Sequence, residues 1–346
     1  MNHRRRTLLK NENCEQLSKK YYNLFYIFAP VMKKMTVIFL LLATIASYGA
    51  RPKIAVVFGG GGAKGAAEVG ALKVIERAGI PVDLVVGTSI GSIVGGLYAC
   101  GYTSAQLDTM FRNQEWLSLL TDRNQEYATQ PYTVKNGVTY IFGFPVLDKD
   151  SKGFGVMKGE RIEQMLDSMS GFRGNISFDK LKIPFRCVAV DFMTTSEYIL
   201  AKGSLAKAIR ASMAIPGIFK PVDWDGAKLV DGGMMNNLPT DVAKNLGAEY
   251  IIAIDLQQSE ANERNYSLKE QWGIGGLLDW VVSRPDVKKY KQNVKLATVY
   301  IHPPLPDYDA SSFGNKNSER MMLIGEQEAM KHWQELMALK EKLLNQ

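Results

Sequence analysis

Two kinds of apolar pattern alternate along most of the chain. Short runs of consecutive apolar residues are typical of strands buried in a parallel sheet, and longer stretches with apolar residues every three or four positions are typical of helices. From residue 51 onwards the two patterns alternate, which predicts an α/β fold with a mostly parallel sheet between helices on both faces. The expected strands cover residues 53–58, 83–86, 185–190, 198–201, 228–230, 250–254 and 297–301.

The expected helices lie between these strands and in the last part of the chain. Gly79 and Pro81 are placed to end the first helix. Asn136-Gly137 lies at the middle of residues 132–142, which predicts a β-hairpin there. No internal repeat or low-complexity linker divides the chain, so we expect one domain with a C-terminal helical part. The helices are expected at 64–78, 90–100, 159–169, 204–213, 276–282 and 318–344, and a polar loop at 257–267.

Two glycine-rich turns each follow an expected strand and open an expected helix. The second, Gly87-Thr88-Ser89-Ile90-Gly91, has the G-x-S-x-G form of a nucleophile elbow, which presents a serine hydroxyl on a tight strand-to-helix turn. The first, at residues 59–65, directs backbone N–H groups and the positive end of a helix at one point. Ser89 is therefore the expected nucleophile, and the first turn is the expected oxyanion hole. The donors expected there are the N–H groups of Gly60, Gly61 and Gly62.

Other interpretations compete at both turns. Gly60-x-Gly62-x-x-Gly65 after a strand also fits a dinucleotide-binding fingerprint, with Asp83 at the distance of a ribose-binding acid. That fingerprint does not explain the second turn, and a phosphate-binding P-loop fits less well because no Gly-Lys-Ser/Thr follows. Lys64 is expected to be a solvated residue of the first helical turn rather than a catalytic group. The alternative for Ser89 is that it lies in a tight turn and that its hydroxyl has no catalytic role.

Asp231 is the expected base. It follows a short strand and precedes Gly232-Gly233, which permits close approach of the backbone. A carboxylate is a weak base, with an ordinary pKa of about 3.9, yet it can accept a serine proton in a partly desolvated site. The alternatives are an Asp-Gly turn, or a triad in the order Ser89, Asp231, His302. His332 lies in an amphipathic stretch and is expected at the surface.

The ordered motifs resemble those of patatin-like phospholipases. The match consists of residues 60–65, 87–91 and 231–233, together with Ala208–Phe219 before the aspartate, and it covers about residues 52–255. The resemblance implies a three-layer α/β/α fold and a Ser89–Asp231 dyad. It also implies hydrolysis of lipid acyl esters at a membrane surface without metal or cofactor. The residues expected to support the motifs are Lys64, Gly65, Gly87, Gly91, Gly232 and Gly233.

The net charge of +7 points to nucleic acid or a membrane surface until its location is considered. The first 49 residues hold eight Lys or Arg and two Asp or Glu, so they account for six of the seven surplus charges. A nucleic-acid partner is therefore not expected. Lys33 and Lys34, the apolar run 37–46 and the small residues that follow have the pattern of a signal peptide at about 32–49. Residues 1–31 fit no such scheme, which favours a translation start at Met32 or Met35.

The leader at 1–50 sets the expectations for location. With the family resemblance it indicates the exported bacterial branch, with the periplasm, the outer membrane or the exterior as destination and a partner in the outer membrane as a further expectation. The rival interpretation makes 21–31 and 37–46 a broken membrane-associated hairpin. The expected parts of the remaining chain are a catalytic domain at 51–256 and a C-terminal part at 257–346.

The alternatives for the chain as a whole stay open. The 318–344 helix is expected to dock on its own domain, to bind a partner or to lie on a membrane. Cys100 and Cys187 are expected to be buried thiols, because three cysteines make no disulfide framework. One alternative is a non-enzymatic lipid-binding or assembly module on a hydrolase fold. The other is an enzyme of a different class, a dinucleotide-binding oxidoreductase.

Overall fold

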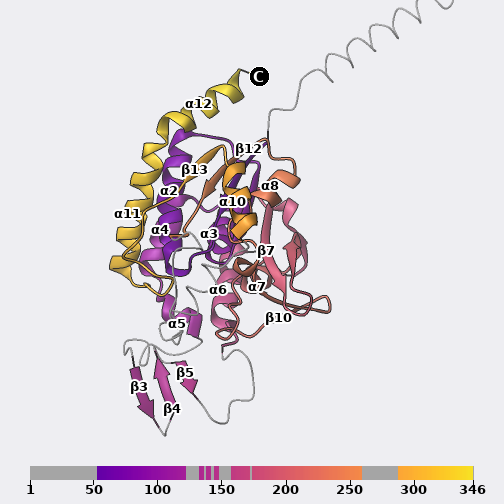
Figure 1. Cartoon of the computed structure of the whole chain (residues 1–346), viewed down its shortest axis with the longest axis vertical. Coiled ribbons are helices and arrows are strands. Elements are labelled where there is room, and N and C mark those ends of the chain that lie inside the picture. Colours follow the sequence, from indigo (N-terminus) through magenta and orange to yellow (C-terminus); the bar gives the residue numbers. More distant parts are fainter. Residues whose placement is uncertain are drawn as a thin grey trace, which may run out of the picture. The chain divides into compact units, whose positions relative to one another are not determined.

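A mostly parallel sheet forms the centre of the fold (Figure 1). The computed structural model describes residues 53–121, 132–135, 138–141, 144–147, 157–171, 174–258 and 287–345. The strand order is β10-β11-β7-β2-β1-β12-β13, and β8 also pairs with β7. Neighbours from β7 to β13 are parallel, whereas β8, β10 and β11 join by antiparallel pairing. The strands are β1 (Ile54–Phe58), β2 (Leu84–Thr88), β7 (Phe185–Asp191), β8 (Ser196–Leu200), β10 (Val222–Trp224), β11 (Ala227–Asp231), β12 (Tyr250–Ile254) and β13 (Val299–Ile301).

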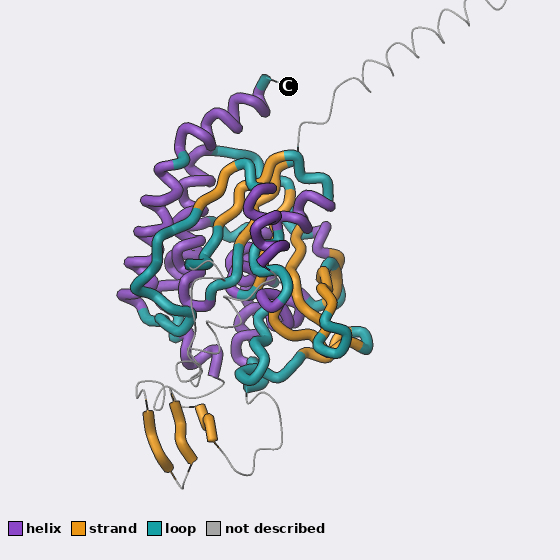
Figure 2. Tube along the Cα trace, in the orientation of Figure 1, coloured by secondary structure: helices purple, strands orange, loops and turns teal. Residues whose placement is uncertain are grey.

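Helices cover both faces of the sheet, as the alternating pattern predicts (Figure 2). Side chains of β1 alternate between the faces: Val56 packs in the core under α2, α3, α7 and α11, whereas Ala55 and Val57 pack under α8 and α10. The three-layer α/β/α architecture is therefore confirmed. The helices are α2 (Gly65–Ala78), α3 (Ile90–Cys100), α4 (Ser104–Asn113), α5 (Trp116–Thr121), α6 (Glu160–Ser170), α7 (Leu205–Ser212), α8 (Thr240–Asn245), α10 (Val287–Leu296), α11 (Asn315–Lys331) and α12 (Trp333–Leu344).

Most of the expected elements are present, with a few differences. The hairpin at 132–142 is confirmed as β3 (Tyr132–Lys135) and β4 (Val138–Ile141), and a third strand, β5 (Phe144–Leu147), extends it. A two-stranded pair, β6 (Ile176–Ser177) and β9 (Lys202–Gly203), was not expected from the pattern. Helices α4, α5, α8 and α10 and strand β10 were not predicted either, although Thr103 and Gln106 form a capping box at the start of α4 that the sequence displays. The expected leader, the helix at 276–282 and most of the polar loop lie outside the described residues.

The predicted helix at 318–344 is two helices. It begins earlier, at Asn315, and it is interrupted at His332, whose N–H donates to the Ala329 carbonyl three residues back. Helical periodicity continues across such a break, so the pattern of apolar residues does not reveal it. Among the described residues, none of the helices combines the length and the apolarity that crossing a bilayer requires.

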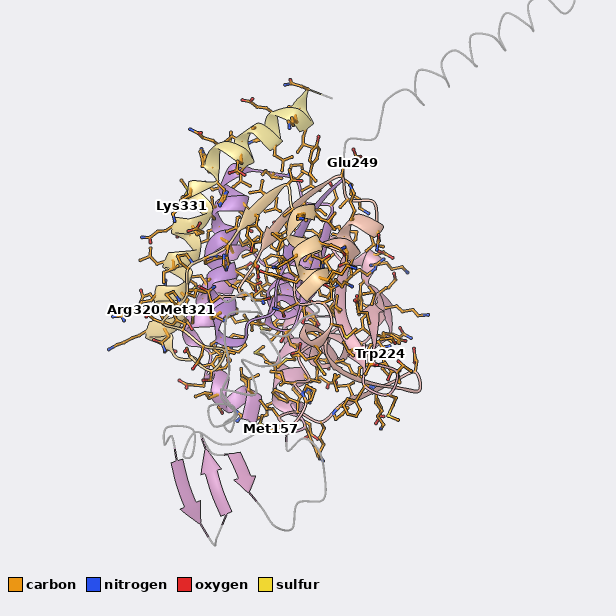
Figure 3. The ribbon with its side chains drawn as sticks, in the orientation of Figure 1. Met157, Trp224, Glu249, Arg320, Met321 and Lys331 are labelled. Carbon is orange, nitrogen blue, oxygen red and sulfur yellow. The ribbon has the colours of Figure 1, made fainter. Side chains whose placement is uncertain are left out.

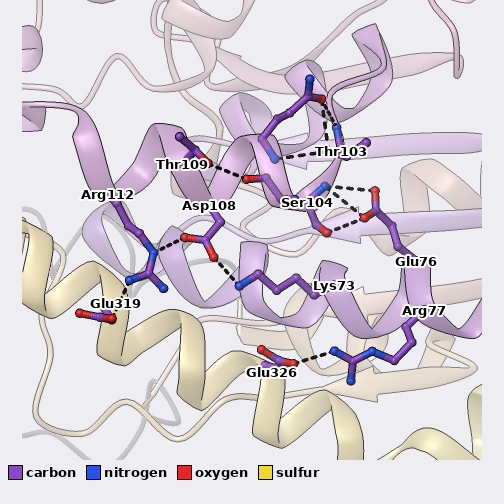
Figure 4. Close-up of polar contacts among 12 residues, drawn as sticks. Lys73, Glu76, Arg77, Thr103, Ser104, Asp108, Thr109, Arg112, Glu319 and Glu326 are labelled. Carbon is purple, nitrogen blue, oxygen red and sulfur yellow. Dashed lines mark hydrogen bonds and ion pairs between the residues drawn. The ribbon is translucent and has the colours of Figure 1, made fainter.

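Helix α11 docks on its own domain through backbone contact with α2. A Cβ on Gly325 would lie 1.9 Å from the Ala67 carbonyl oxygen, and one on Gly70 would lie 1.9 Å from the Met322 carbonyl oxygen. Glycine is therefore needed at both crossing points. Polar contacts border the same interface: Arg77 of α2 pairs with Glu326 of α11 at 2.9 Å, and other ion pairs join α4 to α2 and to α11 (Figure 4). The expectation that this segment docks on its own domain is therefore confirmed for α11.

Candidate active site

Strand β7 brings Ser89 and Asp231 together. Along one edge β7 pairs with β8. Along its other edge β7 pairs first with β2 and then with β11. Thr88, the last residue of β2, lies opposite Val188, and Asp231, the last residue of β11, lies opposite Ala189. Because β11 arrives from the opposite direction, the ends of β2 and β11 meet. The residue that follows β2 is Ser89, so the elbow faces the aspartate.

The side chains of Ser89 and Asp231 form a direct hydrogen bond. Ser89 Oγ donates to Asp231 Oδ2 at 2.7 Å, and the N–H of Gly233 donates to Asp231 Oδ1 at 2.7 Å. Both side chains are buried. Burial raises the pKa of the Asp231 carboxyl from 3.8 to about 6, and the hydrogen bonds from Gly233 and Ser89 oppose that rise. A carboxylate of this pKa is a better proton acceptor than a solvated aspartate.

The backbone of Ser89 is held in a strained conformation. Its φ of 54° and ψ of −122° lie where few residues other than glycine are found. The N–H of Ser89 donates to Ser212 Oγ at 3.0 Å, and the Ser212 hydroxyl donates to the Val188 carbonyl at 2.6 Å. On the other side, the Ser92 hydroxyl and N–H both donate to the Ser89 carbonyl. These contacts fix the elbow on both sides, and no local signal in the sequence identifies Ser212 or Ser92 for this task.

The motif glycines are required by close backbone approach. A Cβ on Gly91 would lie 2.5 Å from the Phe58 carbonyl oxygen, and one on Gly87 would lie 2.4 Å from the Gly91 carbonyl oxygen. The elbow can therefore pass between β1 and α3 only with glycine at these positions. The remaining conflicts for an added Cβ are Gly65 with Ile90 at 2.2 Å, Gly232 with the Val188 carbonyl oxygen at 2.2 Å and Gly233 with Asn237 Oδ1 at 2.9 Å.

The glycine loop after β1 lies beside Ser89. A Cβ on Gly60 would be 3.3 Å from the Ser89 Cβ. The N–H of Gly60, however, donates to the Asn237 carbonyl at 3.0 Å, and the Asn237 side chain returns a hydrogen bond to the Gly60 carbonyl at 3.1 Å. Gly60 is thus removed from the expected oxyanion donors and holds the loop in place. The N–H groups of Gly61 and Gly62 donate to no acceptor within the described ranges.

Residues of the C-terminal part support the glycine loop. The N–H of Ala63 donates to the Ala310 carbonyl at 2.9 Å, and a Cβ on Gly62, whose φ is +57°, would lie 2.3 Å from the same oxygen. The expectation of a solvated Lys64 is wrong, because only 3% of this side chain is exposed. Burial acts to raise the pKa of Asp309, but hydrogen bonds from the hydroxyls of its loop and the charge of Lys64 lower it. The loop at 309–312 was not identified from the sequence.

Asp83 does not lie where a dinucleotide site needs it. It precedes β2, and its carboxylate accepts a hydrogen bond of 2.9 Å from the N–H of Ile54, the first residue of β1. The glycine loop follows the other end of β1, so the acid and the loop lie at opposite edges of the sheet. A ribose-binding acid belongs at the edge that carries the loop.

The histidines lie apart from the dyad. His302 Nε2 contacts the Gln257 carbonyl, and both carboxylate oxygens of Asp231 are occupied by Ser89 and Gly233. The expected alternative of a triad through His302 is therefore not formed. His332 contacts Glu335 at 3.0 Å and is half-buried at the break between α11 and α12.

The two cysteines within the described residues are free thiols. Cys187 is buried as expected, whereas Cys100 is only partly buried. Burial raises the pKa of both thiols, that of Cys100 to about 12. Neither is therefore a thiolate at neutral pH. Within the same part of the chain, no group of three or more His, Cys, Asp or Glu side chains gathers as a metal site.

Comparisons with known proteins identify the family of the chain. A family model described as patatin-like phospholipase matches residues 56–244. Human patatin-like phospholipase domain-containing protein 6 is 31% identical over 283 residues, which are 75% of this chain and 19% of the human protein. Neuropathy target esterase sws of Drosophila melanogaster is 31% identical over 284 residues, which are 76% of this chain and 18% of that protein.

A structural likeness accompanies these matches. The crystal structure of VipD from Legionella pneumophila has a TM-score of 0.46 and 13% identity, with 82% of this chain and 67% of that chain covered. The chain spans about a fifth of the length of the human and Drosophila relatives. The family model matches more than half of the chain, and these relatives are similar over three quarters of it. The chain therefore belongs to the patatin-like phospholipase family.

Proposed function

We propose that the protein is a serine hydrolase of lipid acyl esters, with Ser89 as nucleophile and Asp231 as base. The observation that carries this proposal is the 2.7 Å hydrogen bond between the Ser89 hydroxyl and the buried Asp231 carboxylate. Family membership supports the class of substrate, since both the matched family and the human relative are described as phospholipases. The Drosophila relative is described as an esterase, which supports the same type of bond.

The mechanism has two halves that use the same residues. Asp231 accepts the Ser89 proton as Oγ attacks the ester carbonyl, and the N–H groups of Gly61 and Gly62 stabilise the tetrahedral oxyanion. The proton passes from Asp231 to the leaving alcohol as the acyl-enzyme forms. Asp231 then accepts a proton from water, whose oxygen attacks the acyl-enzyme and releases the fatty acid, and the proton returns to Ser89.

The proposal is tested by hydrolysis of a soluble p-nitrophenyl acyl ester and of phospholipid vesicles by the full chain. Release of p-nitrophenol and of fatty acid is the expected result. A protein that binds the vesicles but hydrolyses neither substrate would instead be the lipid-binding module, and the proposed function would be wrong. A nicotinamide or flavin titration that gave saturable binding would favour the oxidoreductase alternative.

The pH profile should report Asp231. Its pKa is raised from 3.8 to about 6, and only the ionised carboxylate can accept the Ser89 proton. We therefore expect kcat/KM for the soluble ester to rise with pH, to be half-maximal near pH 6 and to level off above pH 7. A profile with its midpoint near pH 4 would mean that burial does not shift the base in the working enzyme. Stability must be followed in parallel, so that unfolding is not taken for protonation.

Ser212 should matter as a positioning residue. Alanine at this position leaves the N–H of Ser89 without its acceptor and the Val188 carbonyl without its donor. We expect kcat for the soluble ester to fall about tenfold, which is about 1.4 kcal/mol, with KM within twofold of wild type. Ser212→Thr retains a hydroxyl and should recover most of kcat. Equal activity in Ser212→Ala and wild type would show that the elbow keeps its geometry without this clamp.

Export is also part of the proposal. Residues 32–49 have the pattern of a signal peptide, and this pattern together with family membership supports the exported branch of the family with a partner in the outer membrane.

A further inference from the structure

The turn between β7 and β8 exposes two consecutive apolar side chains. β7 ends at Asp191, and the chain turns back into β8 through Phe192–Thr195. Met193 is 74% exposed and Phe192 is 44% exposed. Within the described residues, no other two large apolar side chains that are exposed adjoin in sequence. Residues 192–196 carry no charged side chain, and three of the five have hydroxyl groups.

Hydrogen bonds from within the turn fix its shape. Asp191 accepts the N–H of Met193 at 3.1 Å on one carboxylate oxygen and the Thr194 hydroxyl at 2.8 Å on the other. These two bonds lower the pKa of Asp191, so its carboxylate is ionised at neutral pH. The N–H of Phe192 donates to the Lys228 carbonyl on β11 at 2.8 Å. The exposure of Met193 therefore belongs to a defined turn and not to a frayed chain end.

The turn projects from the edge of the sheet that carries the nucleophile. β2 and β7 run parallel, and Thr88 lies opposite Val188, so Ser89 is at the level of the next residue of β7. Phe192 lies three residues farther on, which is about 10 Å along the strand direction at about 3.3 Å per residue. β10 and β11 extend on the same side, and Trp224 marks their far end in Figure 3, across the view from α11.

We propose that the 192–196 turn is a lipid-surface contact, in which Met193 and Phe192 enter the acyl layer of a phospholipid bilayer. Two observations favour a bilayer over a protein partner. The apolar pair is small, three hydroxyl residues follow it, and the Asp191 carboxylate before it is hydrogen-bonded within the turn, which suits the boundary between acyl chains and head groups. The pair also projects from the Ser89 edge, where a lipid ester must arrive. The inference rests on the proposed function for that second argument.

The test compares two double variants of the full chain. Phe192→Ser with Met193→Ser removes the apolar pair, and Leu323→Ser with Met330→Ser removes two exposed apolar residues of α11 as the matched control. Each protein is measured for binding to phosphatidylcholine vesicles, for hydrolysis of the vesicle phospholipid and for hydrolysis of a soluble p-nitrophenyl ester. Thermal unfolding confirms that each variant is folded.

We expect the turn variant to bind vesicles at least tenfold more weakly than wild type, which is about 1.4 kcal/mol, and to lose vesicle hydrolysis in proportion. The soluble ester should be hydrolysed within twofold of wild type, and the α11 variant should match wild type throughout. In a second experiment, Met193→Trp should add emission that shifts to the blue with vesicles, whereas Leu323→Trp should not.

Vesicle binding by the turn variant equal to that of wild type would overturn the inference, as would a loss equally large in the α11 variant. Unshifted emission from Met193→Trp while the protein is bound would also overturn it. Failure of the proposed function gives a different result. If the wild type binds vesicles through the turn but hydrolyses neither ester, the turn is supported as a lipid contact and the proposed function is contradicted.

Discussion

Ser89→Ala should abolish ester hydrolysis while leaving the fold intact. The variant removes the only hydroxyl that donates to the Asp231 carboxylate among the described residues, and with it the attacking atom. Loss of a nucleophile leaves only binding and oxyanion stabilisation, so we expect kcat for the soluble ester to fall by at least about 10³-fold. The measurement is p-nitrophenol release at pH 8, with thermal unfolding to confirm the folded state.

The control for Ser89→Ala is Ser104→Ala. Ser104, the first residue of α4, is also a buried serine, but its hydroxyl donates to Glu76 of α2. This variant should keep its activity, because it removes a buried hydroxyl outside the site. Activity in Ser89→Ala within tenfold of wild type would exclude the elbow serine as nucleophile. Ser89→Ala should also raise the pKa of Asp231 further, because the hydrogen bond from Ser89 is one of the two that lower it.

Asp231→Asn should be inactive and more stable than wild type at neutral pH. The amide cannot take the Ser89 proton, and we expect kcat to fall by about 10³-fold or more. The wild-type carboxyl has a pKa of about 6 when folded and an ordinary value near 3.8 when unfolded. Burying the ionised group therefore costs up to about 3 kcal/mol above pH 6, at 1.36 kcal/mol per pKa unit.

The contribution of Asp231 to stability changes with pH in the opposite direction to that of a salt-bridged aspartate. Between about pH 4 and pH 6 the folded protein binds a proton that the unfolded chain has lost, so the Asp231 contribution to stability falls as pH rises. Asparagine does not ionise. The advantage of Asp231→Asn in melting temperature should thus be absent at pH 4 and complete above pH 6. A difference that did not change with pH would mean that Asp231 is not buried as an ionised base.

Two further variants separate the dyad from its rivals. His302→Ala should retain hydrolysis, because Asp231 is bonded to Ser89 and Gly233 and not to a histidine. Asp83→Asn changes an acid at the opposite edge of the sheet and should also retain it. Loss of activity in His302→Ala equal to that in Asp231→Asn would restore the triad.

Much of the candidate site was predictable because its motifs are short. A nucleophile elbow needs glycine on both sides of the serine: a Cβ on Gly87 would meet the Gly91 carbonyl oxygen, and a Cβ on Gly91 would meet the Phe58 carbonyl oxygen of β1. Gly232, after the aspartate, is needed because its Cβ would meet the Val188 carbonyl oxygen of β7. The glycines of residues 87–91 and 231–233 therefore indicate two tight turns in the sequence. The strands before them are recognised as buried because they are apolar runs.

Features that depend on distant pairing were not predictable. Nothing near Gly60 indicates that the Asn237 carbonyl accepts its N–H, and nothing near Lys64 indicates that this side chain is buried with its charge acting on Asp309. Ser212 is 123 residues from the N–H that it accepts. The apolar period that runs through His332 is the same whether the helix continues or breaks.

By itself the sequence determined the fold class, the elbow serine, the glycine loop and the candidate base, since each depends on a few neighbouring residues. The tertiary structure decided which carboxylate the serine hydroxyl meets and which glycine N–H groups are already hydrogen-bonded. Ser89 and Asp231 are 142 residues apart, and they touch because β2 and β11 end against the same edge of β7 from opposite directions. Strand pairing of this kind is set by the packing of the whole sheet, which no local pattern encodes.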